Sequence, residues 1–233
     1  MKIAVLTTDT APHRFFVNEI ARNTNYMIGV FLEAEPADPH GFKLPVTVQQ
    51  GLAEFNTWSG LKGSNVDWAR ASTFCTIKSL NYAFAITELK RFKPDLILVN
   101  GTLKLGAEII AIAPDRIVNF HSGDPRHYRG LHCDMWTIWH KDWNNLGVCA
   151  HRLVEKLDAG AVLDAEMIVP PADLAGLGVA KAEAAAKLAR RVVERFERNR
   201  VFEEDYTPGR YYGLMPTVLQ EQVDGILKRR ASG

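Results

Sequence analysis

The segment Lys2–Thr7 constrains the fold more than any other part of the sequence. It is an almost unbroken apolar run with isoleucine and valine, the pattern of a strand that is buried on both faces. Residues around Phe15–Asn23 then show helical spacing, and Tyr26–Leu32 is a second apolar run. This strand–helix–strand unit predicts an α/β fold with a doubly wound, mostly parallel sheet of the Rossmann-like kind.

The rest of the chain continues this pattern and ends in a short extension. Between Glu33 and Ser64, scattered proline and glycine predict an irregular excursion or two short strands. We predict helices at Val66–Phe92, Ala107–Ala113, Leu131–His140, Ala180–Phe196 and Val218–Lys228, and strands at Asp95–Val99, Ile117–His121, Gly147–Val154 and Ala161–Val169. The last two strands should pair in an antiparallel manner.

These elements suggest one domain with an appendage. We assign residues 1–200 to a catalytic domain and residues 201–233 to a C-terminal extension. The extension holds an aromatic turn, Pro208–Gly213, and the last predicted helix, after which Arg229–Gly233 should fray.

Composition narrows the functional classes. The net charge of +1 gives no general reason to expect nucleic-acid or acidic-membrane partners. Cys75, Cys133 and Cys149 are too few and too scattered for a disulfide framework, so buried reduced thiols are expected, which favours the cytoplasm. The apolar run Ile3–Leu6 is too short for a signal peptide, and no apolar segment of membrane-spanning length follows. A soluble cytoplasmic protein is therefore expected.

Polar side chains gather at the end of the strand Ile117–His121. Because side chains two residues apart on a strand point to the same face, Asn119 and His121 should project together. Pro125 cannot continue a sheet, so the strand should end near His121. The carboxyl ends of strands in open α/β sheets are where ligands bind. An amide donor and a titratable imidazole are thus expected side by side at a ligand-binding edge.

Each of these residues taken alone has an ordinary structural explanation, and Asp158-Ala159-Gly160 would by default be a hairpin turn. The combination is more specific. Asn119-Phe120-His121, then Pro125, then Arg129-Gly130, with Asp158 placed 39 residues after Asn119, resembles the formyltransferase family. That family includes the glycinamide ribonucleotide, methionyl-tRNA and sugar N-formyltransferases. The resemblance is firm over Asp95–Val169 and looser over the N-terminal strand–helix–strand unit.

The resemblance implies transfer of a formyl group from 10-formyltetrahydrofolate to an amine, through a tetrahedral intermediate that carries an oxyanion. Asn119 and His121 both offer donors for that oxygen, and one preorganised donor is typically worth ~3 kcal/mol in the barrier. Asp158 should hold the His121 ring, raise its pKa, and accept the proton that leaves the amine, directly or through a water. No covalent enzyme intermediate is needed, because the amine is the nucleophile.

The family also implies where the formyl donor lies. Its pterin usually occupies a pocket between the loop that follows the preceding strand and the loop that carries the aspartate. The cofactor-binding residues would then be Gly101, Thr102, Leu103, Lys104, Leu105, Glu155 and Leu157. Leu103 and Leu105 would form apolar walls, although ordinary core packing explains each of them equally well.

Departures from the family pattern bear on the identity of the amine. The segment Thr8–Pro12 lacks the glycines of a phosphate loop, which argues against glycinamide ribonucleotide. The segment Val201–Gly233 is too short for the β-barrel of methionyl-tRNA formyltransferases, and hydrolases of the family carry an additional N-terminal domain. The loop His127–Gly130 and the helix Met135–Trp139 resemble the sugar N-formyltransferases. These act on nucleotide-linked amino sugars, commonly a 4-amino-4,6-dideoxyhexose used in surface polysaccharides, and are often homodimers.

A nucleotide-linked sugar needs cations for its diphosphate and an aromatic face for its base. The substrate-binding candidates are Arg14, Arg126, Arg129 and Arg210 for the first role, Tyr128, Tyr211 and Tyr212 for the second, and the adjoining Gly130. For any one of these residues, a solvated arginine or a core aromatic is the ordinary alternative.

Two other classes of function remain open at this point. His121, His127, His132, Cys133 and His140 are of metal-ligand type, but they lack the usual ligand spacing and no HExxH motif occurs, so we expect no metal. A nucleotide-binding module without catalysis is also compatible with a doubly wound start, because fold does not fix function.

Overall fold

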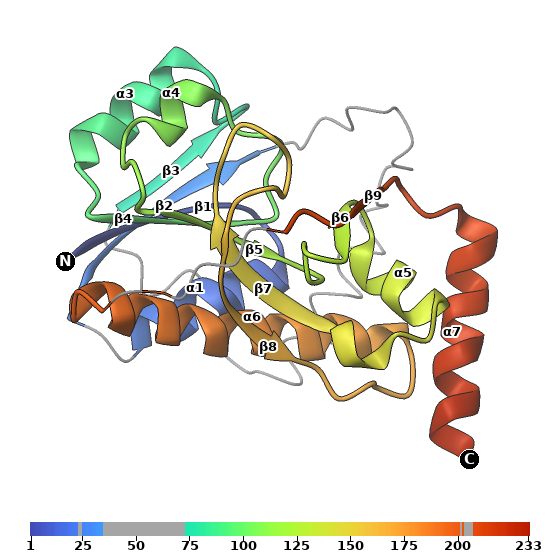
Figure 1. The fold of residues 1–233 in the computed structure, drawn as a ribbon. Coiled ribbons are helices and arrows are strands. Elements are labelled where there is room, and N and C mark those ends of the chain that lie inside the picture. The colour runs from blue at the N-terminus through green and yellow to red at the C-terminus, as the bar shows by residue number, and fades with distance from the viewer. Residues whose placement is uncertain (23–24, 35–72, 201, 203–206) are drawn as a thin grey trace. The chain divides into compact units, whose positions relative to one another are not determined.

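The computed structural model describes residues 1–22, 25–34, 73–200, 202 and 207–233 (Figure 1). These residues form two compact units, Met1–Ile117 and Val118–Gly233. The predicted excursion Glu33–Ser64 lies outside the described residues except for Glu33 and Ala34. The boundary that we place at residue 200 stays a prediction.

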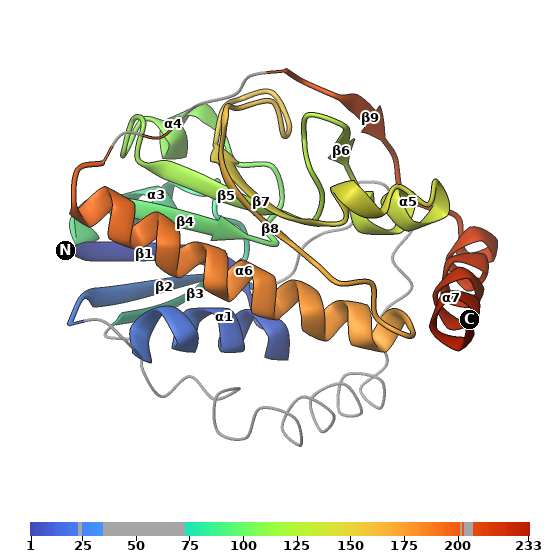
Figure 2. The same ribbon diagram turned by 60° about the horizontal axis from the view of Figure 1, so that its bottom comes forward.

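The first unit contains a parallel four-stranded sheet in the order β3-β2-β1-β4. Its elements are β1 (Lys2–Thr8), α1 (Ala11–Arg22), β2 (Met27–Glu33), β3 (Thr73–Ile77), α3 (Ala83–Phe92), β4 (Leu96–Asn100) and α4 (Ala107–Ile110). Helix α1 lies on one face of this sheet, and α3 and α4 lie on the other (Figures 1 and 2). Apolar residues of β1 and β4 are almost entirely buried, as expected for strands covered on both faces. The predicted strand–helix–strand opening is confirmed.

The prediction of one long helix over Val66–Phe92 is wrong in its described part. Strand β3 occupies Thr73–Ile77 and pairs in parallel with β2, and only Ala83–Phe92 is helical. The segment Thr73–Ile77 contains three β-branched residues and a phenylalanine, which favour an extended chain. The helical spacing in the rest of the predicted range concealed this local preference. Helix α3 ends as expected before Pro94, with Lys93 in the left-handed conformation.

The second unit contains the antiparallel strands β5, β7 and β8 and a separate parallel pair, β6 with β9. Its elements are β5 (Ile117–His121), β6 (Tyr128–Gly130), α5 (Cys133–Trp139), the 3-10 turn η2 (Trp143–Asn145), β7 (Gly147–Arg152), β8 (Val162–Met167), α6 (Leu174–Glu197), β9 (Arg210–Tyr212) and α7 (Thr217–Ser232). The predicted β7–β8 hairpin is confirmed. The sequence showed loops where β6 and β9 lie, and helix α7 continues to Ser232 instead of fraying from Arg229.

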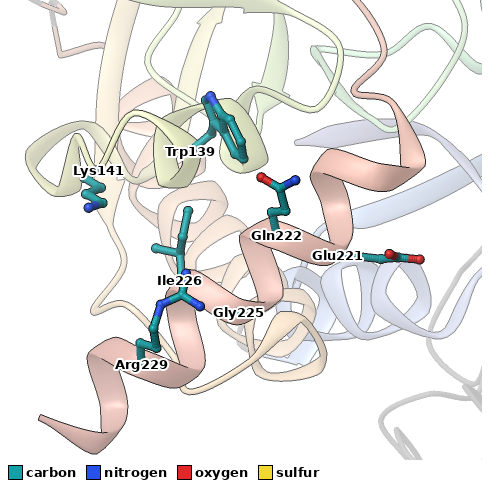
Figure 3. A pocket seen from close by; sticks show the side chains of 7 residues that line it. All are labelled: Trp139, Lys141, Glu221, Gln222, Gly225, Ile226 and Arg229. Atoms are coloured by element: carbon teal, nitrogen blue, oxygen red, sulfur yellow. The ribbon is translucent and has the colours of Figure 1, made fainter.

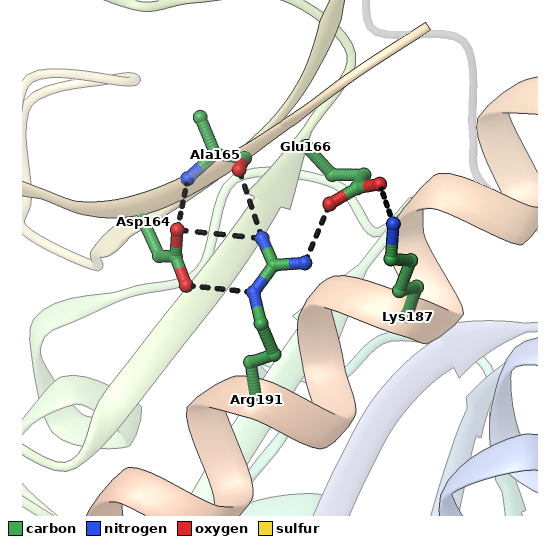
Figure 4. A network of polar contacts seen from close by, with 5 residues as sticks. All are labelled: Asp164, Ala165, Glu166, Lys187 and Arg191. Atoms are coloured by element: carbon green, nitrogen blue, oxygen red, sulfur yellow. Dashed lines mark hydrogen bonds and ion pairs between the residues drawn. The ribbon is translucent and has the colours of Figure 1, made fainter.

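Helix α6 packs on β7 and β8 and is fixed by polar contacts. Asp173 caps its first turn, where Oδ1 accepts a hydrogen bond from the N–H of Gly176 at 2.8 Å. Arg191 donates to Asp164 (Nε to Oδ2, 3.1 Å) and to Glu166, which also pairs with Lys187 (Figure 4). This network joins helix α6 to strand β8.

Candidate active site

Strand β5 carries the two polar residues that the sequence singles out. Asn119 and His121 lie two residues apart on it, with His121 buried and Asn119 partly exposed. The antiparallel register places His151 of β7 opposite Asn119, and Cys149 opposite His121. Both predicted side chains therefore belong to a packed sheet that limits their movement.

Asp158, in the loop after β7, reaches both of these residues. Its carboxylate is buried, with Oδ2 3.8 Å from His121 Nδ1 and Oδ1 3.5 Å from Asn119 Nδ2. Its backbone has a φ of 44°, an uncommon value for a residue with a side chain, so local structure holds it in place. The structure thus brings the three predicted catalytic residues together, although they are distributed over 39 positions.

His151 completes this group and was not anticipated from the sequence. Its Nδ1 donates a hydrogen bond of 2.9 Å to the carbonyl of Arg152, which leaves Nε2 as an acceptor in the neutral ring. Nε2 accepts from Asn119 Nδ2 at 3.0 Å and lies 3.6 Å from Asp158 Oδ1. A polar residue in an otherwise apolar buried strand was the available signal, but one histidine of that kind is usually structural.

The charges of this cluster follow from burial and from mutual attraction. Burial opposes ionisation of Asp158, but the nearby His121 and His151 rings and the Gly130 N–H outweigh it and lower the carboxyl pKa to about 2. For His121, burial lowers the pKa and outweighs the opposite effect of Asp158. Asp158 thus raises the pKa of His121, as expected, but burial outweighs this effect, so the protonated ring is not favoured. At neutral pH the site holds a carboxylate beside a neutral imidazole.

Strand β6 contacts both of these groups through its backbone. The carbonyl of Tyr128 lies 3.1 Å from His121 Nε2, which donates to it, and the N–H of Gly130 donates to Asp158 Oδ2 at 3.0 Å. Gly130 has a φ of 102°, and a Cβ there would lie 2.2 Å from the carbonyl oxygen of Tyr212. Only glycine fits this position, at which β6 and β9 approach each other closely.

The loop Gly101–Leu105, predicted to bind the formyl donor, belongs to the first unit and is held by two side chains. The buried Glu33 accepts hydrogen bonds from the N–H groups of Leu103 (2.9 Å) and Leu80 (3.3 Å). The Asn81 amide donates to the carbonyl of Lys104 and accepts from the N–H of Gly106. The loop is therefore preorganised by groups that its own sequence does not contain.

The side chains predicted to bind the formyl donor differ in their exposure to solvent. Leu103 is half-buried, but Leu105 is a core residue with 4% exposure, in accord with its ordinary packing alternative. The Thr102 hydroxyl donates to the carbonyl of Leu103, and Gly101 packs against the His13 ring. In the second unit, Glu155 is exposed and Leu157 is half-buried.

The three tyrosines predicted to stack on a base are not equivalent. Tyr128 is 5% exposed, and its ring contacts those of Tyr212 and His140, with centroid distances of 5.2 and 5.8 Å. Tyr212 also contacts Trp136 and the guanidinium of Arg210. Only Tyr211 has a ring that is half exposed to solvent, and one edge of that ring lies against Gly130. The rings of Tyr128 and Tyr212 thus join β6, α5 and β9 into one aromatic cluster. This leaves Tyr211 as the candidate for stacking on a base.

The predicted arginines also differ. Arg14 is paired with Asp9 at 2.7 Å, and Arg126 with Asp124 through Nε (2.9 Å) and a terminal nitrogen (2.6 Å). Arg210 is exposed over the Tyr212 ring. Arg129 is buried, and among the described residues its guanidinium donates one hydrogen bond, to the carbonyl of Gly209 at 3.4 Å.

Two features outside this cluster were candidates for a functional site in the described part of the chain, a metal centre and a surface cavity. Within the described ranges, no group of three or more histidine, cysteine, aspartate or glutamate side chains is placed to hold a metal ion. A cavity of about 660 Å³ lies between α5 and α7, lined among others by Trp139, Gly225 and Ile226 (Figure 3). None of the predicted site residues lines it. Among the described helices, none has the length and apolar character needed to span a membrane.

A family model of formyl transferases matches residues 1–189. The chain belongs to the formyl transferase family. The matched region contains β5, β7 and the Asp158 loop, so the clustered residues lie within the part that defines the family. The activity class is accordingly that of a formyl-transferring enzyme. No curated protein matches the sequence.

Solved formyl transferases share the fold at low sequence identity. A 4-N formyltransferase from Francisella tularensis is 16% identical with a TM-score of 0.62, over 99% of this chain and 87% of that one. A sugar N-formyltransferase from Shewanella sp FDAARGOS_354 is 14% identical with a TM-score of 0.64, over 97% and 87%. A glycinamide ribonucleotide transformylase from Symbiobacterium toebii is 13% identical with a TM-score of 0.62, over 90% and 94%. The predicted α/β Rossmann-like fold is confirmed.

Proposed function

We propose that this formyl transferase moves the formyl group of 10-formyltetrahydrofolate to the amine of a nucleotide-linked amino sugar, a 4-amino-4,6-dideoxyhexose being the leading candidate. The observation that supports this most directly is the convergence of Asn119, His121 and Asp158 in one buried cluster. Such a cluster offers a neutral amide, a neutral imidazole and a carboxylate around one point. These are the groups that acyl transfer to an amine requires.

The reaction forms a C–N bond to the amine while the electron pair of the formyl C=O bond moves to oxygen. Asn119 has two amide hydrogens, of which one is donated to His151 at 3.0 Å and the other faces Asp158 Oδ1 at 3.5 Å. The second contact is long, and we assign its hydrogen to the developing oxyanion when the substrates are bound. As the intermediate collapses, the bond from the formyl carbon to N10 of the folate breaks. The leaving nitrogen takes the electron pair and a proton.

Proton movement is assigned from the charges of the cluster. With a pKa of about 2, Asp158 is a weak base on its own and acts mainly by attracting positive charge. The neutral His121 ring donates through Nε2 to Tyr128, so Nδ1 is left as an acceptor 3.8 Å from Asp158 Oδ2. An amine nitrogen or a water between these two atoms can pass its proton to Nδ1. The carboxylate then stabilises the imidazolium that forms.

The choice of an amino sugar rests on two observations. The β1–α1 segment Thr8–Pro12 has no glycine with which to build a phosphate loop, which disfavours glycinamide ribonucleotide. Two of the structural neighbours are described as a 4-N formyltransferase and a sugar N-formyltransferase. A small amine like glycinamide ribonucleotide is the second candidate, favoured by the similarity to the Symbiobacterium transformylase.

The test is a transfer assay. The protein is incubated with 10-formyltetrahydrofolate and a panel of nucleotide-linked amino sugars, with glycinamide ribonucleotide as a competitor, and products are examined by mass spectrometry. Gain of one formyl group by a sugar supports the proposal, and the Asp158→Asn protein serves as the blank. Formylation of glycinamide ribonucleotide alone would replace the sugar with the second candidate. No transfer to any amine would refute the proposal.

A further inference from the structure

Arg129 is a buried cation that has no countercharge among the residues that the structure describes. Its exposed fraction is 9%, and its Nε is fully enclosed without a hydrogen-bond partner. The side chain donates only one hydrogen bond, to the Gly209 carbonyl at 3.4 Å, and within the described residues no carboxylate pairs with it. An unpaired buried charge is costly, whereas arginine pairs readily with oxyanions through its planar donors.

Other arginines of the same unit show the usual arrangement. Arg126 forms a forked pair with Asp124, and Arg191 bridges Asp164 and Glu166 (Figure 4). Each of these guanidinium groups is neutralised by a carboxylate of the chain. Arg129 is more buried than either, so solvation does not explain why no described carboxylate pairs with it.

The position of Arg129 connects it to the reactive cluster. The two residues that flank it on β6 contact that cluster through their backbones, Tyr128 with His121 and Gly130 with Asp158. In the β6–β9 register, Arg129 is opposite Tyr211, the half-exposed ring, and side chains at paired positions share one face. A cation and an open aromatic ring therefore lie on the same face of this strand pair.

We infer that Arg129 binds an oxyanion of a substrate, and that the diphosphate of the amine substrate fits it best. This inference rests on the proposed function for the identity of the substrate, but not for the binding of an anion. The glutamate carboxylates of the folate are the other source of the same chemistry. Arg129 is then a binding residue, with Tyr211 as the adjoining wall.

The first experiment measures anion binding without catalysis. Pyrophosphate is titrated into the full chain at constant ionic strength, set with sodium chloride, and affinity is followed by calorimetry and by thermal unfolding. We expect the wild type to bind pyrophosphate and to gain thermal stability. Arg129→Met should bind at least tenfold more weakly, and Arg129→Lys should be intermediate because it keeps the charge without the planar fork.

The matched control is Arg191→Met, which removes an arginine that has carboxylate partners. Without pyrophosphate, Arg129→Met should melt at or above the wild-type temperature because it removes an unpaired buried charge, whereas Arg191→Met should melt lower. Arg191→Met should keep the wild-type affinity for pyrophosphate. Equal pyrophosphate binding by the wild type and Arg129→Met would overturn the inference. If Arg129→Met does not fold, either wild-type affinity for pyrophosphate in Arg129→Lys or no response of the wild type to pyrophosphate would also overturn it.

A second experiment distinguishes the substrate diphosphate from the folate carboxylates as the anion at Arg129. It also tests the anion site separately from the proposed function. In the transfer assay, Arg129→Lys should raise the KM of the nucleotide-linked substrate and leave that of the folate unchanged, whereas the reverse would assign the arginine to the folate. Binding of pyrophosphate through Arg129 without any formyl transfer would leave the anion site in place and refute the proposed function. If Arg129→Lys keeps transfer with both KM values unchanged and binds pyrophosphate as the wild type does, the anion site is refuted and the proposed function stands.

Discussion

The backbone N–H of Gly130 donates a 3.0 Å hydrogen bond to Oδ2 of Asp158, and this bond joins strand β6 to the carboxylate of the candidate site. The carbonyl of Tyr128, two residues earlier, accepts from His121. One edge of a three-residue strand thus holds both members of the carboxylate–imidazole pair. Its other edge pairs with β9. Four predictions test these contacts and the role of Glu33, which holds the loop Gly101–Leu105 that is predicted to bind the formyl donor.

Gly130→Ala should damage both stability and activity. The added Cβ would meet the Tyr212 carbonyl oxygen at 2.2 Å in a backbone conformation with a φ of 102°. We expect a loss of about 1–3 kcal/mol in the free energy of unfolding, with transfer reduced because Asp158 shifts. Denaturant unfolding measures the first quantity. Gly213→Ala is the matched control, since a Cβ there meets nothing within 4 Å; equal behaviour of the two variants would contradict the prediction.

Asp158→Asn should fold and lose transfer by ~100-fold or more, the usual range for a group that handles protons and charge. Its effect on stability should depend on pH. The folded-state pKa of about 2 lies below the ordinary 3.8, so the ionised carboxylate stabilises the fold above about pH 4. This contribution, about 2 kcal/mol, is lost as the pH falls through 2. Acid unfolding of the wild type should show this loss and that of Asp158→Asn should not; parallel curves would disprove the assignment.

The neutral state of His121 predicts a different pH range. Burial lowers its pKa below the ordinary 6.5, so the unfolded chain takes up the proton first as the pH falls. The neutral ring therefore contributes stability above pH 6.5 that declines at lower pH. His121→Gln should flatten this decline, and His127→Gln, which changes an exposed histidine, should keep it. Proton resonances of the His121 ring that titrate at or above pH 6.5 would be inconsistent with this account.

Glu33→Gln should weaken binding of the formyl donor. Glu33 accepts from two backbone N–H groups, and a glutamine amide would place a donor against one of them. We expect at least a tenfold rise in the Kd of 10-formyltetrahydrofolate, measured by fluorescence, with the KM of the amine unchanged. Glu88→Gln, in a surface pair with Arg91, is the control. An unchanged Kd in Glu33→Gln would separate this loop from donor binding.

The three clustered residues were accessible from the sequence because each lies in a short, recognisable pattern. Asn119 and His121 share one strand, and Asp158 marks a turn between two apolar runs whose pairing is local. The net pKa direction of His121 was not accessible, because it depends on how completely the ring is buried. Local patterning specifies which groups meet, whereas the packed surroundings decide their charge.

The parts that the sequence did not reveal depend on distant or very short segments. Strands β6 and β9 have three residues each and pair across about 80 positions, too little for any periodic signal. Glu33 and Asn81 support a loop that begins at Gly101, and nothing near that loop announces them. Whether a carboxylate pairs with Arg129 likewise depends on which side chains surround it in the folded protein, and the sequence near Arg129 does not show this. The wrong prediction over Val66–Phe92 has a different cause, because a helical pattern was extended across residues 73–77, which form a strand.

The pairing of β6 with β9 has a consequence for how the family region is delimited. The family match ends at residue 189, yet residues 210–212 pair with the strand whose backbone contacts His121 and Asp158. A chain shortened to the matched region would keep Asn119, His121 and Asp158 but would lose strand β9, which pairs with β6. Exchanging C-terminal segments between relatives should accordingly alter the geometry of the Asp158–His121 pair.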